Sequence, residues 1–139
     1  MYHVVLDPIV LLRGLINPHS ICGSLLSEYA GRYKAIFSSE TSLALVVLPR
    51  HPLLVAKYPR LVRVDPRQAG RLLAHAEKVP IDLATVPNAV VATAIAANAD
   101  YIICEDAHLL AAREKIVTPM LTASEFVTLL ASEQPVTPK

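Results

Sequence analysis

The chain has 139 residues and a formal net charge of +1, a length that suits one domain and a charge that does not by itself indicate nucleic-acid binding. A hydrophobic content of 53% argues against disorder. No run approaches the ~18 uninterrupted apolar residues of a membrane span, and we expect no signal peptide because Asp7 and Pro8 interrupt the N-terminal apolar stretch.

Short apolar runs and helix signals alternate in the first half of the chain. They predict buried strands over residues 3–6 and 35–37, a short helix or turn over 9–16, helices over 21–31 and 39–48, and another helical turn over 51–58. Ser20 and Ser39 are the expected N-caps of the helices that follow them. Because residues 43–48 are apolar on every face, we expect burial of that helix on more than one side.

The second half continues the alternation. Its signals predict a helix over 67–77, a short strand over 79–83, an alanine-rich helix over 89–98, a buried strand over 101–104, a last strand over 116–118 and a helix led by a capping box over 122–125. Strands that alternate with helices imply an α/β fold with a parallel sheet covered by helices on both faces. We expect one domain over residues 1–133 and a loose tail over 134–139.

Acidic side chains follow two of the predicted strands. Asp7 ends the first strand, and Glu105 and Asp106 end the strand over residues 101–104. The carboxyl ends of parallel strands meet at one edge of a sheet, where open α/β folds bind ligands. Two acids far apart in the sequence could therefore share one crevice.

Cysteine, histidine and glycine spacing exclude several kinds of site. Cys22 and Cys104 match no metal or redox spacing, so we expect free, buried thiols in a reducing cytoplasm. The five histidines form no HxxH or HxxxH pair, which argues against zinc. No glycine forms a phosphate-cradling loop after a strand, which argues against a dinucleotide or nucleoside triphosphate site.

Basic side chains gather in residues 50–71, where Asp65 is the one acid. They are Arg50, Lys57, Arg60, Arg63, Arg67 and Arg71. Such a local excess can contact phosphates. A solvated helical face would have the same composition, and both interpretations stay open.

Residues 4–7 (VVLD) are followed by an apolar helix and Asn17-Pro18, and residues 92–110 contain a small-residue helix, an apolar strand and an acid ahead of Leu109 and Leu110. In these two stretches the chain resembles the opening and the closing half of a PIN domain. The resemblance covers nearly the whole chain. It implies a three-layer α/β/α sandwich and a metal-dependent ribonuclease, in many cases the toxin of a toxin–antitoxin pair. Three or four acids hold Mg²⁺ or Mn²⁺ in such enzymes.

Two of the family's four acid positions are not acidic here. Asp7 and Asp106 match the first and last acids, whereas Leu45 and Asn88 stand at the other two. The resemblance thus implies Asp7, Asn88 and Asp106 as catalytic residues, and these three with Glu105 as metal ligands. Asn88 offers a neutral oxygen and Leu45 offers none, so we expect weak binding of Mg²⁺ or Mn²⁺.

Each of these polar residues also has a structural alternative. Asp7 and Asp106 could each be the N-cap of the helix that follows. Glu40 is expected to be favourable charge at a helix N-terminus rather than a ligand. Asp82 remains a substitute ligand, and His108 is expected to be a surface residue rather than a base.

We therefore predict a PIN-like protein with weak or lost nuclease activity. The alternative is an active Mg²⁺-dependent toxin-type endoribonuclease that cleaves single-stranded RNA. RNA, an antitoxin-like protein and a second copy of the chain are the partners left open, and no membrane partner is expected.

Overall fold

A central parallel sheet organises the fold. The computed structural model describes residues 1–63, 67, 70, 71, 76–86 and 88–132, and in these residues five strands pair in the order β3-β2-β1-β4-β5. The strands are β1 (Tyr2–Leu6), β2 (Tyr33–Phe37), β3 (Glu77–Lys78), β4 (Tyr101–Ile103) and β5 (Met120–Leu121). All of their pairings are parallel.

Helices connect the strands. The α-helices are α1 (Pro8–Ile16), α2 (Ile21–Leu26), α3 (Ser39–Val47), α4 (Pro52–Lys57), α6 (Ala89–Ala97), α7 (Ala107–Ala111) and α8 (Ala123–Ser132). Short 3₁₀ helices add η1 (Ala30–Arg32), η2 (Leu48–Arg50), η3 (Pro59–Arg63) and η4 (Arg113–Lys115). None of the described helices combines the length and the hydrophobicity that a membrane span needs.

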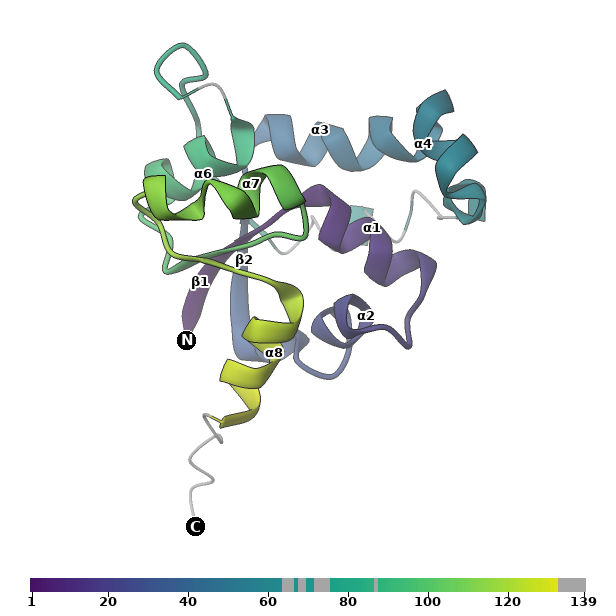
Figure 1. The fold of residues 1–139 in the computed structure, drawn as a ribbon, viewed down its shortest axis with the longest axis horizontal. Coiled ribbons are helices and arrows are strands. Elements are labelled where there is room, and N and C mark those ends of the chain that lie inside the picture. The colour runs from purple at the N-terminus through teal and green to yellow at the C-terminus, as the bar shows by residue number, and fades with distance from the viewer. Residues whose placement is uncertain (64–66, 68–69, 72–75, 87, 133–139) are drawn as a thin grey trace.

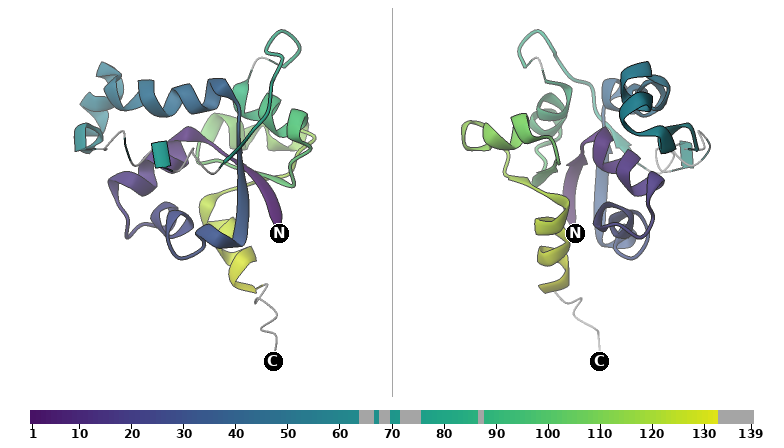
Figure 2. Two further views of the ribbon diagram at one scale, coloured as in Figure 1. Left: turned by 180° about the vertical axis from the view of Figure 1, so that it is seen from behind. Right: turned by 45° about the vertical axis from the view of Figure 1, so that its right-hand side comes forward.

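The helices form a layer on each face of the sheet (Figures 1 and 2). Successive side chains of a strand point to opposite faces, so Val4 and Leu6 belong to a core with α1, α2, α3 and α8, whereas Val5 packs against α6. These strands are buried on both sides, which is why they are apolar without alternation. The α/β fold with helices on both faces of a parallel sheet is confirmed.

The strand order reverses next to β1. From β1 the chain moves to β2 and β3 on one side, and β4 and β5 lie on the other side. Ligands of open α/β sheets bind at such a switch point, outside the carboxyl ends of the strands. Here the two strands at the switch point are β1 and β4, paired at Leu6 and Ile103.

Two predicted strands are wrong. The strand expected over 79–83 is β3 at Glu77–Lys78, because Asp82 instead forms a turn in which it accepts hydrogen bonds from Ala84 N and Thr85 Oγ1. The strand expected over 116–118 is β5 at Met120–Leu121, where Met120 is buried; Val117 is 92% exposed.

Several helix predictions also need correction. The helix expected over 21–31 ends at Leu26 and is followed by η1, and the N-cap of α3 is Ser38 rather than Ser39. Burial of the 43–48 stretch on several sides is wrong, since Leu43 is 60% exposed while Leu45 is 1% exposed. The helix expected over 67–77 lies mostly outside the described residues, and its last residue is in β3. The tail over 134–139 also lies outside them.

Candidate functional site

Asp7 lies at the carboxyl end of the central strand. Its backbone N–H donates to Ile103 O at 2.9 Å, which continues the ladder between β1 and β4. Its side chain is the N-cap of α1 and accepts from Ile9 N at 3.0 Å. Asp7 is only 8% exposed. The alternative expected from the sequence, that Asp7 is the N-cap of the following helix, is therefore one role of this carboxylate.

Cys104 joins Asp7 to the second predicted acid. The buried thiol donates to Asp7 Oδ2 at 3.3 Å, and its sulfur accepts from Asp106 N at 3.2 Å. Asp106 is in turn the N-cap of α7 and accepts from His108 N at 2.9 Å. The structure therefore brings Asp7 and Asp106 to the same edge, at the strand-order reversal, through one thiol.

Burial controls the ionisation of this edge. Loss of solvation raises the pKa of Asp7, and the negative charge of Asp106 raises it further, although hydrogen bonds from Ile9 and Cys104 lower it. Burial raises the pKa of Cys104 to about 12, with the nearby charges of Asp7 and Asp106 acting in the same direction. The thiol therefore keeps its proton at neutral pH and can donate a hydrogen bond to Asp7.

The other two acid positions of the resemblance supply no charge. Asn88 is the N-cap of α6, and its Oδ1 accepts from Val90 N at 2.9 Å and Val91 N at 3.1 Å. Among the hydrogen bonds of the described chain, none joins Asn88 to Asp7 or Asp106. Leu45 is buried in the core on the α1 side of the sheet.

Three further acids and His108 lie apart from the hydrogen bonds that link Asp7 to Asp106. Glu105 is half-buried, and its charge raises the pKa of the Cys22 thiol, after the larger effect of burial. Glu40 is exposed in the first turn of α3, and Asp82 is exposed in its own turn. His108 is exposed in α7, as expected of a surface residue.

A buried hydroxyl cluster lies beside this edge, and sequence reasoning missed it. Ser38 directly follows β2, at the same edge of the sheet at which Asp7 follows β1. Ser38 and Thr41 form a reciprocal capping box, and the Thr93 hydroxyl lies 2.9 Å from Ser38 Oγ. The cluster ties α6 to the start of α3. In the sequence, the one signal for this cluster was the Ser38 hydroxyl directly after the predicted strand over residues 35–37.

The donors at this edge fit a resident Mg²⁺ poorly. Both carboxylate oxygens of Asp7 already accept hydrogen bonds, as does Oδ1 of Asp106, and Asn88 Oδ1 accepts two. Mg²⁺ requires near-octahedral oxygen ligands and gives up water reluctantly. Within the described ranges, no group of three or more His, Cys, Asp or Glu side chains is placed to hold a metal ion.

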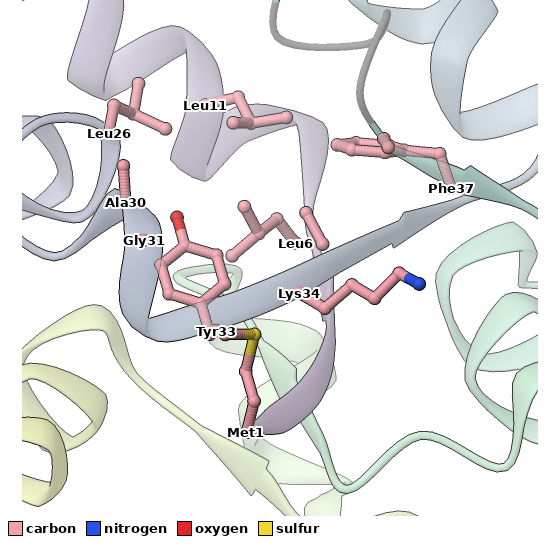
Figure 3. A pocket seen from close by; sticks show the side chains of 11 residues that line it. Met1, Leu6, Leu11, Leu26, Ala30, Gly31, Tyr33, Lys34 and Phe37 are labelled. Carbon is pink, nitrogen blue, oxygen red and sulfur yellow. The ribbon is translucent and has the colours of Figure 1, made fainter.

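The cavity of about 330 Å³ drawn in Figure 3 lies elsewhere, against β1 and β2. Apolar side chains such as Leu6, Leu11 and Phe37 line it, together with Lys34. Tyr33 also lines it, but its hydroxyl donates to Leu25 O and is not free. None of the predicted site residues borders this cavity.

No protein-family model matches this chain. No curated protein matches it either.

Proposed function

We propose that the protein is a relative of PIN-domain endoribonucleases with weak or lost nuclease activity. The observation that carries the proposal is the use of the polar residues at the family's acid positions. Asp7, Asn88 and Asp106 are each the N-cap of a helix. Their oxygens satisfy backbone N–H groups that would otherwise be left unpaired at those helix starts.

The charge available to a metal is also small. Asp7 and Asp106 supply at most two negative charges, and burial disfavours the charged form of Asp7. The neutral Cys104 thiol already donates a hydrogen bond to one of the carboxylate oxygens of Asp7. We propose that Mg²⁺ or Mn²⁺ binds weakly here, mainly through its hydration shell, because too little charge offsets the cost of dehydration.

An RNA digestion tests the proposal. Single-stranded RNA is incubated with millimolar Mg²⁺ or Mn²⁺ and the wild type, Asp7→Asn, or Asp82→Asn as a matched acid-to-amide control at an exposed turn. We expect little cleavage by any of the three. Robust cleavage by the wild type and the control that Asp7→Asn abolishes would instead establish the active toxin-type nuclease.

The proposal extends to surroundings and partners. Cys22 and Cys104 are both free and buried, which supports a reducing compartment such as the cytoplasm. RNA or an antitoxin-like protein remain the partners proposed from the resemblance. A small antitoxin gene immediately upstream would support the second of these.

A further inference from the structure

A second hollow lies at the C-terminal end of α1. It has a volume of about 400 Å³, which is within the range of small-molecule sites. Residues from the end of α1 and the start of α2 form one wall, and the junction of α4 and η3 forms the other. We call it the basic hollow; its lining includes Arg13, Asn17, Ile21, Cys22, Tyr58 and Arg60.

Two arginines line the basic hollow, and Glu105 is an acid whose charge reaches this lining at Cys22. Arg13 and Arg60 line it, and the Lys57 ammonium lies 5.5 Å from the centroid of the Tyr58 ring. In the part of the chain that the structure describes, none of the three ion pairs uses any of these cations. The charge of Arg13 does act on Asp7, but that carboxylate is buried. The guanidinium groups are therefore available to an anion.

The hollow also offers an aromatic and apolar surface. Tyr58 is 37% exposed and Ile21 is 50% exposed, both large apolar surfaces open to solvent. A smaller apolar cavity of about 30 Å³ shares Arg13 and Tyr58 with the hollow and reaches Leu54 and Leu61. A planar ring can stack on Tyr58 or a guanidinium while an attached anion meets the arginines.

We infer that the basic hollow binds a phosphate ester of a planar aromatic group, of the size of a nucleoside monophosphate. Arg13 and Arg60 hold the phosphate, and Tyr58 contacts the ring. Side chains supply the phosphate contacts, so no glycine-rich loop is needed. The inference is independent of the proposed function, since none of these residues is a candidate metal ligand.

Adenosine 5′-monophosphate, inorganic phosphate and adenosine are the probes, each titrated by calorimetry and by backbone-amide NMR. We expect the monophosphate to bind more tightly than either fragment and to shift the amide signals of Asn17, Ile21 and Tyr58. Arg60→Gln is expected to weaken its binding about tenfold, the effect of losing a charge-assisted hydrogen bond. Lys115→Gln removes the same charge from the exposed η4 and is expected to change affinity little.

Tyr58→Leu tests the contribution of the ring contact separately from that of the phosphate contacts. This variant is expected to bind the monophosphate at least about fivefold more weakly, because a stacking surface is lost, and to bind inorganic phosphate as tightly as wild type does. Because Tyr58 and Arg60 are exposed, we expect both variants to remain folded, and their urea midpoints check this.

Four results would overturn the inference. They are no binding of the monophosphate at about 5 mM, an equal effect of Arg60→Gln and Lys115→Gln, equal binding of a hexaglutamate peptide, and a 5′-phosphorylated oligonucleotide that binds more than about a hundredfold tighter than the monophosphate. The last would make the hollow part of a nucleic-acid surface. None of these results changes the expected outcome of the RNA digestion.

Discussion

At the scale of single residues, Asp7 combines two requirements that oppose each other. It begins α1 as a helix cap, which favours a negative charge near the helix N-terminus. It is also buried, which disfavours that charge and raises its pKa. The hydrogen bond that Cys104 donates to Asp7 Oδ2 stabilises the charged carboxylate and so lowers the pKa of Asp7, against the larger effect of burial.

The raised pKa of Asp7 predicts the pH dependence of stability. A carboxyl group whose pKa is higher in the folded state stabilises the fold below its unfolded pKa, and that contribution is lost as the pH rises through the folded pKa. Asp7→Asn is neutral at every pH, and asparagine is an equally good N-cap. We therefore expect Asp7→Asn to gain stability relative to wild type at pH 7 and to lose this advantage at pH 3, measured by urea unfolding.

Asp82 provides a control of opposite sign. Hydrogen bonds from Thr85 and Ala84 lower the pKa of this exposed acid. Its contribution is present above the unfolded pKa and lost as the pH falls, so Asp82→Asn should lose a little stability at pH 7. If both variants responded to pH in the same direction, the assignment of the Asp7 effect to burial would be wrong.

Leu45 carries a second residue-scale prediction. The resemblance places an acid there, and Leu45 is buried. Leu45→Glu should lower the free energy of unfolding by about 2–5 kcal/mol, since it removes a core leucine and buries a carboxylate. We also expect it to raise the affinity for Mg²⁺, measured by calorimetry on protein that remains folded.

Leu43→Glu is the matched control for this variant, because Leu43 lies on the same helix and is 60% exposed. It should change stability by less than about 0.5 kcal/mol and leave Mg²⁺ binding unchanged. An unchanged Mg²⁺ affinity in Leu45→Glu would show that Leu45 does not occupy the family's acid position.

At the scale of elements, helix starts determine much of this structure. The capping box of Thr122 and Glu125, expected from the sequence, is confirmed by two reciprocal hydrogen bonds. The Ser20 cap is likewise confirmed. The cap of α3 was placed one residue late because Ser38 and Ser39 offer the same hydroxyl, and only the hydrogen bonds to Thr41 distinguish them.

Two variants of Asn88 test its role as the N-cap of α6 separately from the absence of an acid at this position. Asn88→Ala should destabilise the protein by about 1 kcal/mol, because Val90 N and Val91 N lose their acceptor. Asn88→Asp keeps the cap and adds a carboxylate, so its unfolding free energy should match that of wild type. Urea unfolding of the two variants measures both effects. Equal stability of wild type and Asn88→Ala would show that the cap contributes nothing.

At the scale of the whole molecule, alternation of strands and helices was sufficient to predict a parallel sheet with helices on both faces. The two edge strands were misplaced because β3 and β5 contain only two residues each, too few to show any periodicity. The role of Cys104 could not be predicted either. Its partner Asp7 is 97 residues away, and no local pattern marks a thiol as the link between two acids.

The position of β1 in the sheet also has a consequence for how the protein is made. The central strand emerges from the ribosome before its neighbours, yet its pairing with β4 must wait until Tyr101–Ile103 has been synthesised. At a typical synthesis rate this wait is on the order of ten seconds. During it, the edge of β1 that later receives β4 has no partner from the sheet. Co-translational folding of this sheet can therefore finish only after most of the domain has been made.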